Sequence, residues 1–262
     1  MQNANQPLSS GQAGGQTDEP WCELIPEDQW SVFHDGTGAL DRAQVPFLLA
    51  GALALAVYTK HWRNTKDLDV IIRADQKDTA VKAMLEAGFV DYYEQEAYDR
   101  SWIFRGFKEG VIFDVIWSLP NHRVSVDKDW FARARPLSMR GRSHQAVAPE
   151  VLIHVKLYVL QRSRCDWVDV LNVLAGTAGT LDWDFLVERM GRDLPLLHAI
   201  LAVFNWMSPA RADDIPPKLR ARFALPPIEA EDLAAMEERR TRVLDSRPWF
   251  AAHQPSDRPL EL

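Results

Sequence analysis

Two aspartates separated by one residue lie in a short apolar run of the sequence. Asp67 and Asp69 flank Leu68, and Val70 to Ile72 continue the run. Side chains alternate across a strand, so we expect both carboxylates on one face, with Cα atoms about 6.6–6.8 Å apart. Adjacent negative charges repel, which favours protonation of one group or a cation between them. The spacing is typical of two acids that share a proton or bind a cation.

A third acid occupies a β-rich run further along the chain. Val111 to Trp117 is apolar except for Asp114, which falls on the face opposite Phe113 and Val115. If this strand lies beside the strand of the acid pair with those faces aligned, three carboxylates converge. Such a triad can hold two divalent ions, which clamp a triphosphate and activate an attacking oxygen. The alternative is that Asp67 and Asp114 are solvent-facing strand residues.

The segment upstream of the acid pair has residues that phosphate binding uses. An apolar strand, Val45 to Leu49, leads through Gly51 into an Ala/Leu-rich helix over 52–58. Backbone N–H groups at such a helix start can receive phosphate oxygens, although the same turn occurs in every α/β fold. Two cations and a hydroxyl follow in the next loop: Arg63, Thr65 and Lys66. Arg63 can contact a phosphate through two N–H groups, and a solvated basic loop that balances the acids is the alternative.

The hydrophobic pattern predicts an α+β chain in two parts. Short β-rich runs alternate with helical ones up to residue 148, and from Pro149 the pattern is helical. We expect strands over 45–49, 67–72, 101–107 and 111–117, and helices over 52–58, 76–87, 149–159, 166–174, 182–190, 195–206 and 229–243. The predicted organisation is a disordered lead (1–24), a sheet-bearing domain (25–148), a helical domain (149–246) and a loose tail (247–262).

Composition narrows the class of protein. The 262 residues are 47% hydrophobic and 26% charged, an ordinary globular balance, with 37 acids against 30 bases. This net charge argues against non-specific binding of duplex DNA. No apolar run approaches the roughly 20 residues of a membrane span, and residues 1–20 lack a signal-peptide pattern. Two distant cysteines, Cys22 and Cys165, cannot form a disulfide framework, so we expect a reduced, cytoplasmic protein without a membrane partner.

At the candidate site the chain resembles a known family. Ala50 to Thr59, followed by Arg63 to Asp69, is similar to the Gly-Gly-Ala-x-Ala-Leu…Tyr-Thr-Gly…Arg-x-Thr-Lys-Asp-Leu-Asp signature of bacterial nucleotidyltransferases. These proteins belong to the DNA polymerase β-like superfamily, near the AbiEii-type toxins and minimal nucleotidyltransferases. The run from Lys156 to Val159 resembles the helical segment that follows in the family, together with Arg162, Arg164, Asp166 and Asp169. The resemblance extends from residue 46 to about residue 209.

The resemblance implies a small mixed palm sheet and a helical bundle that closes one side of a nucleotide cleft. It implies metal-dependent transfer of a nucleoside monophosphate from an NTP to a hydroxyl of a small molecule, a protein or an RNA, with release of pyrophosphate. Asp67 and Asp69 would bind Mg²⁺ or Mn²⁺, and Asp114 would be the third ligand and activate the acceptor hydroxyl. The residues that would bind the nucleotide and its phosphates are Gly51, Ala52, Arg63, Thr65, Lys66 and Lys156.

Departures from the signature leave a second hypothesis open. Ala50 and Ala52 flank the glycine, so no hydroxyl follows it, and Lys60 stands where the family has glycine. A weaker hold on the triphosphate would suit a nucleotide- or partner-binding module without turnover, such as half of a toxin–antitoxin pair. A glycosyltransferase, whose Asp-x-Asp also holds a metal, would need a longer α/β region than about 120 residues.

Charged residues of the helical part have structural alternatives. Lys156 lies among apolar neighbours and can point into the cleft or outward to solvent. Asp166 is favoured as a helix N-cap, and Asp169 as a salt-bridge partner of Lys156 or Arg162. The basic run from Arg133 to Arg142 is expected to be a charged connector between the two parts of the chain.

Overall fold

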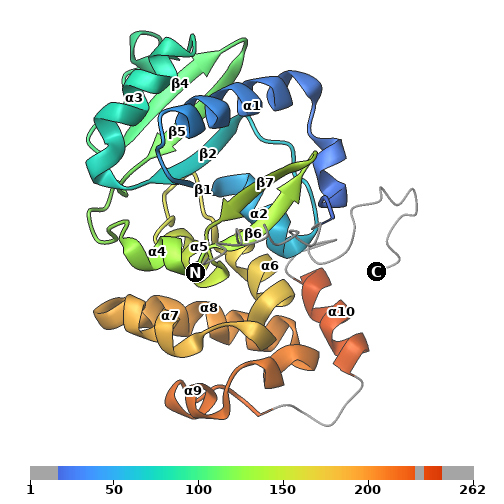
Figure 1. Cartoon of the computed structure of the whole chain (residues 1–262). Helices are drawn as coiled ribbons and strands as arrows, with labels where there is room; N and C mark the ends of the chain where they lie inside the picture. The colour runs from blue at the N-terminus through green and yellow to red at the C-terminus, as the bar shows by residue number, and fades with distance from the viewer. Residues whose placement is uncertain (1–16, 228–232, 244–262) are drawn as a thin grey trace, which may run out of the picture.

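One mixed sheet organises the computed structural model, which describes residues 17–227 and 233–243 (Figure 1). The strand order is β3-β4-β5-β2-β1-β7-β6. The strands are β1 (Phe47–Leu49), β2 (Asp67–Ile72), β3 (Val90–Asp91), β4 (Ile103–Lys108), β5 (Val111–Ile116), β6 (Arg135–Met139) and β7 (Arg142–Ala146). A helical part follows the sheet, so the predicted α+β class is confirmed.

Helices cover the sheet on both sides. Helices α1 and α3 contact each other and lie over β4 and β5, whereas α5 to α9 lie below the sheet in Figure 1. The helices are α1 (Glu27–Arg42), α2 (Gly51–Thr59), α3 (Lys77–Glu86), α4 (Lys128–Ala132), α5 (Pro149–Leu157), α6 (Trp167–Thr177), α7 (Trp183–Met190), α8 (Leu194–Met207), α9 (Pro217–Arg222) and α10 (Leu233–Val243). None of these helices combines the length and apolar character that crossing a bilayer requires.

Alternate residues of β2 belong to two different apolar clusters of the core. Leu68, Val70 and Ile72 are buried in the apolar cluster under α1 and α3. Ile71 belongs to the second cluster, which the helices of the C-terminal part share. The polar positions of the strand, Asp67 and Asp69, lie on the same side as Ile71 because alternate residues share a face. The acids therefore face the helical part of the molecule.

Among the elements that the sequence did not predict, α1 and the β6–β7 hairpin are the longest. Helix α1 contains Gly36 and Gly38, which lower helix propensity. Packing requires the first of them, since a Cβ at Gly36 would lie 2.6 Å from Cε2 of Phe113. The basic run from 133 to 142 contains the β6–β7 hairpin, so its interpretation as a connector was wrong. Strand β6 buries Leu137 and Met139. Charged residues next to them form ion pairs with other elements, as Arg140 does with Glu27.

Part of the predicted N-terminal lead is packed against the sheet. A 3-10 helix, η1 (Pro20–Leu24), buries Trp21 and Cys22. Trp21 stacks on Trp62 with ring centroids 6.0 Å apart. Aromatic burial of this kind explains why residues 17–24 do not follow the expectation of a disordered segment. Residues 1–16 and the tail 247–262 lie outside the described residues.

Candidate active site

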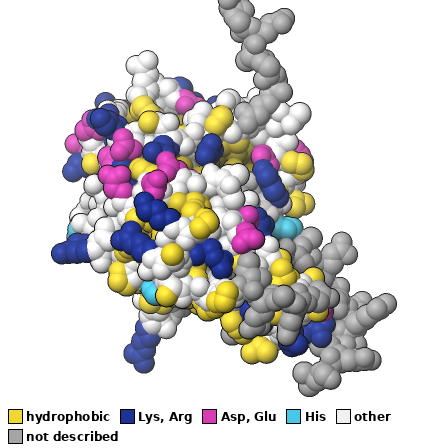
Figure 2. All heavy atoms as spheres, turned by 90° about the horizontal axis from the view of Figure 1, so that it is seen from below, with side chains coloured by type: hydrophobic (Ala, Val, Ile, Leu, Met, Phe, Trp, Pro, Cys, Tyr) yellow, Lys and Arg dark blue, Asp and Glu magenta, His cyan; other side chains and the backbone are white. Residues whose placement is uncertain are grey.

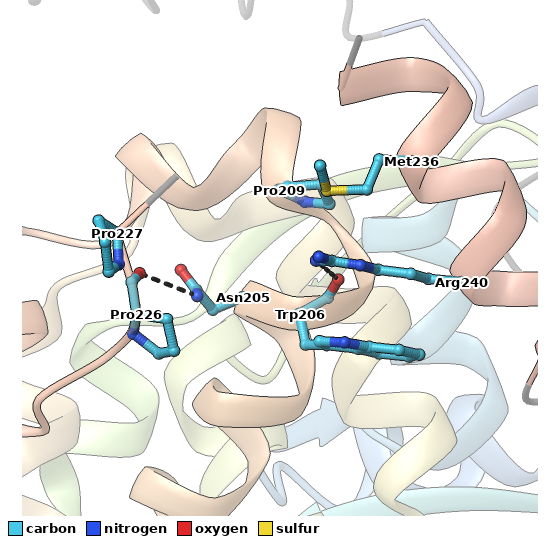
Figure 3. Close-up of a pocket in the computed structure, with 7 residues that line it drawn as sticks. All are labelled: Asn205, Trp206, Pro209, Pro226, Pro227, Met236 and Arg240. Atoms are coloured by element: carbon cyan, nitrogen blue, oxygen red, sulfur yellow. Dashed lines mark hydrogen bonds between the residues drawn. The ribbon is translucent and has the colours of Figure 1, made fainter. Parts of the chain in front are cut away.

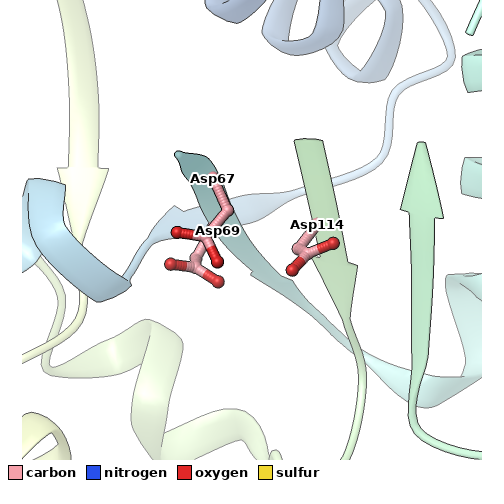
Figure 4. A group of neighbouring side chains, drawn as sticks. All are labelled: Asp67, Asp69 and Asp114. Carbon is pink, nitrogen blue, oxygen red and sulfur yellow. The ribbon is translucent and has the colours of Figure 1, made fainter. Parts of the chain in front are cut away.

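The three predicted acids meet at one place on the sheet (Figure 4). Asp67 and Asp69 come from β2, and Asp114 comes from β5, which is parallel to β2 with Asp69 paired to Asp114. One carboxylate oxygen of each residue lies within 4.8 Å of the others. The side chain of Asp114 is only 2% exposed, so the solvent-facing alternative was wrong for this residue. Oxygen ligands at this spacing suit a hard divalent cation.

The electrostatics of the triad also favour a cation. Desolvation, followed by the charges of Asp67 and Asp114, raises the pKa of Asp69 to about 7. Desolvation also raises the pKa of Asp114, although the guanidinium of Arg105 opposes that shift. Three carboxylates that repel one another in a desolvated site are stabilised when positive charge is added. The donor set and its charge thus fit Mg²⁺ or Mn²⁺.

Sequence reasoning missed Arg105, the partner of the third acid. Its Nε and Nη2 donate hydrogen bonds to the two oxygens of Asp114 at 3.0 and 2.7 Å. Arg105 faces Asp114 directly across the antiparallel β4–β5 pair. The two-residue turn at Glu109 and Gly110 sets this register. The hairpin predicted from the sequence therefore already indicated which residue lies opposite Asp114.

Helix α2 begins directly against the acids. Gly51 has φ of +50°, and a Cβ there would overlap Oδ2 of Asp69. The residue therefore must be glycine for two reasons, its left-handed backbone and the close approach of the carboxylate. No side chain caps the first turn of α2, where Ala52 is half-buried, so the first-turn N–H groups have no side-chain partner.

Replacing Gly51 with alanine is expected to damage the site more than the fold. The added Cβ must push the Asp69 carboxylate away, and left-handed backbone costs a non-glycine residue about 1–3 kcal/mol. The nucleotide transfer that the resemblance implies should fall at least about 100-fold, because misplacement of a reacting group by 1 Å costs that much. A radiolabel transfer assay, with urea unfolding alongside, measures both effects. Wild-type activity in Gly51→Ala would contradict the structural reasoning, and Gly110→Ala, in a turn with open space, is the control for backbone strain.

The loop before β2 braces the acids. Thr65 Oγ1 donates to Oδ1 of Asp67 at 2.7 Å, which orients that carboxylate. Arg63 donates to both oxygens of Asp169 on α6, at 3.1 and 3.3 Å, and joins the sheet to the helical part. Lys66 is exposed to solvent. The structure thus places this loop beside the triad and gives protein partners to Arg63 and Thr65, two of the three residues that the sequence assigned to phosphate binding.

Lys156 is buried beneath this loop. Its Nζ donates to Asp166 at 2.8 Å and to Asp169 at 2.7 Å, so the solvent-facing alternative was wrong. The predicted pairing of Asp169 with Lys156 is confirmed. Asp166 occupies the predicted N-cap position of α6, but its side chain accepts no hydrogen bond from the first turn of the helix. It accepts hydrogen bonds from Lys156 and Arg164 instead, so the predicted capping role was wrong.

Arg164 is a second residue that the predicted site omitted. Its Nε and Nη2 donate to the two oxygens of Asp166 at 2.9 and 3.0 Å. Its hydrogen bonds to Asp166 raise the pKa of Arg164, and the charges of Asp166, Asp67 and Asp69 add to that shift. The sequence shows the Arg-x-Asp pattern of Arg164 and Asp166. That pattern does not indicate that the loop before α6 folds back toward β2.

Away from the triad, a pocket of about 290 Å³ lies between α8 and α10 (Figure 3). Arg240 donates to the carbonyl oxygen of Trp206 at 2.7 Å, and Asn205 donates to that of Pro226 at 3.4 Å. Prolines and Met236 form the rest of its lining, so it offers neither carboxylates nor a nucleophile. From below, the helical end shows Lys and Arg side chains scattered among apolar and acidic ones (Figure 2).

Comparison with known proteins links the chain to one family. A family model described as "Uncharacterised nucleotidyltransferase" matches residues 38–207, which include the triad, Lys156 and Arg164. No curated protein matches the chain.

Several solved structures are similar over much of the chain. The antibiotic-resistance factor ANT(2'')-Ia is 11% identical with a TM-score of 0.47, covering 67% of this chain and 96% of its own. The lincosamide antibiotic adenylyltransferase LnuA is 15% identical with a TM-score of 0.43, covering 58% and 99%. JHP933 from Helicobacter pylori is 13% identical with a TM-score of 0.42, covering 85% and 98%. Likeness at this level says nothing about substrates.

Proposed function

The chain belongs to the uncharacterised nucleotidyltransferase family, and from that premise we propose that it transfers a nucleoside monophosphate from an NTP to an acceptor hydroxyl. The observation that carries the proposal is the convergence of Asp67, Asp69 and Asp114 within 4.8 Å beside the start of α2. A cluster of three carboxylates next to helix N–H groups without a side-chain cap matches the needs of a bound triphosphate.

In the proposed mechanism, Asp67, Asp69 and Asp114 would hold Mg²⁺ or Mn²⁺, and the ion would neutralise phosphate charge when bound. Asp114 accepts the proton of the acceptor hydroxyl, whose oxygen attacks the α-phosphorus. The new O–P bond forms as the bond to the β-phosphate oxygen breaks, and pyrophosphate leaves. Thr65 keeps Asp67 in place through its 2.7 Å hydrogen bond. Gly51 lets the phosphates approach the backbone of α2.

The test of this proposal is transfer of label from α-labelled NTPs. Each of the four nucleotides is incubated with the full chain, a divalent cation and acceptor pools of RNA, protein and small molecules. We expect label in one acceptor class together with pyrophosphate. Absence of label from every pool under conditions where the protein binds Mg-NTP would contradict the proposal.

That outcome would favour the second candidate, a nucleotide-binding module without turnover. Ala52 favours this candidate, because the residue after Gly51 offers no hydroxyl to a phosphate. A role in a toxin–antitoxin pair belongs to this second candidate, and the sequence resemblance to the AbiEii-type toxins supports it. A cytoplasmic location is proposed from the two distant cysteines.

Cation binding by the site is expected to depend on pH. Because the pKa of Asp69 is raised to about 7, the carboxylate must lose a proton near neutrality before it can bind a cation. Apparent Mn²⁺ affinity should rise by about tenfold per pH unit below pH 7 and level off above it. Calorimetry from pH 5.5 to 8.5 measures this slope, with Asp69→Asn as the variant that lacks it. A flat profile for the wild type would contradict the assignment.

A further inference from the structure

We propose that the acceptor hydroxyl belongs to a neutral small molecule with an aromatic body, which lies on an apolar part of the sheet beside the triad. This surface, which we call the apolar stripe, consists of Ile112 on β5, Phe107 on β4, Val90 on β3 and Tyr92 directly after β3. The inference rests on the proposed function, because it takes Asp114 as the group that accepts the proton of the acceptor hydroxyl.

Strand pairing sets the course of the apolar stripe. The register pairs Asp67 with Ile112, and Ile112 with Phe107. Phe107 is paired in turn with Val90 on β3, which is the outermost strand of the sheet. Directly paired residues share a face, and neighbouring strands lie about 4.8 Å apart, so the row extends about 10 Å from Ile112 to Val90. The apolar stripe therefore begins beside a carboxylate of the triad and ends at the sheet edge.

The proton-accepting acid lies in the next row of the same face. Asp114 follows Ile112 by two residues on β5, so their side chains share a face, with Cα atoms about 6.6–6.8 Å apart. Arg105 precedes Phe107 by two residues on β4 and donates to both oxygens of Asp114, which places these two rows side by side. A ring that lies on Ile112 and Phe107 would thus hold a hydroxyl at its rim next to Asp114.

The apolar stripe is accessible to solvent. Val90 is 53% exposed, and Phe107, Ile112 and Tyr92 are half-buried. The other face of the same strands is closed by α1 and α3, where Phe113 is fully buried. Single exposed apolar side chains are ordinary, whereas a contiguous apolar row that leads into a group of polar side chains is typical of a ligand site.

Two aromatic rings form the outer half of the apolar stripe. The ring centroids of Tyr92 and Phe107 are 5.7 Å apart, and the ring planes are inclined by 47°. A third ring can join such a pair in an offset or edge-to-face arrangement, which contributes more than the apolar area that it buries. The apolar stripe therefore favours an acceptor with an aromatic body over an aliphatic one.

The arginines that flank the apolar stripe are paired with acids. Arg105 forms an ion pair with Asp114 at 2.7 Å, and Arg100 forms one with Asp91, also at 2.7 Å. The four side chains of the apolar stripe carry no charge themselves. A charged acceptor would have to lose water over uncharged side chains, which is costly without a partner. An RNA acceptor would also need unpaired cations for its phosphates. These surroundings favour a neutral acceptor.

The transfer to such an acceptor follows the proposed mechanism. Asp114 accepts the proton of the acceptor hydroxyl, and the hydroxyl oxygen forms a bond to the α-phosphorus. The bond from the α-phosphorus to the β-phosphate oxygen breaks, and pyrophosphate leaves with that electron pair. The product is a phosphodiester that joins the nucleoside to the aromatic compound.

The experiment measures label transfer from an α-labelled NTP to 4-hydroxybenzyl alcohol and 2-phenylethanol, and the binding of both compounds by saturation-transfer NMR. Glucose, glucosamine, an RNA oligonucleotide and a tyrosine-containing peptide are the comparison acceptors. The variants are Phe107→Ala, Phe107→Leu and Val90→Ser. The matched control is Leu85→Ser, which changes an exposed apolar residue on α3, away from the apolar stripe.

We expect the wild type to label the aromatic alcohols. The KM for these alcohols should rise about tenfold in Phe107→Ala and about threefold in Val90→Ser, because apolar contact with the ring is lost. Phe107→Leu keeps most of the apolar volume, so it should retain the Tm of the wild type and have an intermediate KM. The KM for NTP in every variant, and both KM values in Leu85→Ser, should change less than about twofold.

The outcomes separate this inference from the proposed function. Label in the sugars, the RNA or the peptide, but in neither aromatic alcohol, would overturn the inference and leave the function standing. An unchanged KM for the aromatic alcohols in Phe107→Ala and Val90→Ser would do the same. Binding of the aromatic alcohols that both variants weaken, without label in any acceptor, would support the ligand class of the apolar stripe and contradict the function.

Discussion

Asp69→Asn is expected to lower divalent-dependent transfer from an α-labelled NTP by at least about 10³-fold. Asp69 lies against the start of α2, and its carboxylate belongs to the only group of three His, Cys, Asp or Glu side chains within the described residues that is placed to hold a metal ion. Charge stabilisation by a catalytic cation is worth several kcal/mol, and a neutral amide removes one of its anionic ligands. Initial rates at saturating NTP and cation measure the effect.

Asp69→Asn should not destabilise the fold, and the pH dependence of unfolding explains why. Asp69 has a pKa raised to about 7, so the folded state holds its proton more tightly than the unfolded chain does. The stability that this proton provides is complete below the ordinary pKa of aspartate and is lost as the pH rises through 7. In metal-free buffer at pH 8, Asp69→Asn is therefore expected to have a higher Tm than the wild type, with the difference vanishing near pH 4.

A matched variant makes the result specific. Asp75→Asn removes an exposed acid just beyond β2, whose partner Arg73 is also exposed. We expect wild-type transfer and an unchanged Tm, since exposed pairs contribute little. If Asp69→Asn retained wild-type transfer, or if its loss of activity came with a lower Tm at pH 8, the role of Asp69 as a cation ligand would be wrong.

Local patterns predicted the acid triad because it depends on short-range rules. Alternation in β2 places Asp67 and Asp69 on one face, and alternation in β5 places Asp114 opposite Phe113. Local alternation could not predict that β2 and β5 pair as parallel neighbours with Asp69 opposite Asp114. That register depends on the crossover through α3 and β4, which a single sequence does not encode locally.

The elements that sequence reasoning missed depend on distant contacts. Helix α1 has low propensity at Gly36 and forms because it packs on Phe113, 77 residues later in the chain. The arginines of 133–142 look like a solvated run until Arg140 pairs with Glu27 at 2.6 Å and the alternate side chains enter the core. Tertiary packing overrides local preference at both places.

Lys156 shows why a charged residue on a helix cannot be interpreted alone. The residues alone favour the surface for it and the family resemblance favours the cleft, whereas the structure places it between two buried acids. Only the return of the chain at Asp166 and Asp169 creates that environment. The same three residues then determine where Arg63 and Arg164 point.

Lys156→Met is expected to lower the free energy of unfolding by about 3–5 kcal/mol. The substitution keeps much of the volume but removes the shared cation, and breaking a buried ion pair from one side leaves uncompensated buried charge. Asp166 would keep Arg164 and Asp169 would keep Arg63, yet their facing oxygens would then repel. Urea unfolding at pH 7.5 measures the loss.

Two further variants separate this cause from a loss of packing. Lys66→Met changes an exposed lysine and should stay within about 0.5 kcal/mol of the wild type. Adding Asp169→Asn to Lys156→Met removes one of the two repelling charges, so part of the lost stability should return. If the double variant were no more stable than Lys156→Met, repulsion between the acids would not be the cause. If Lys156→Met lost less than about 1 kcal/mol, Lys156 would not hold Asp166 and Asp169 together, and Arg63 and Arg164 would need another support.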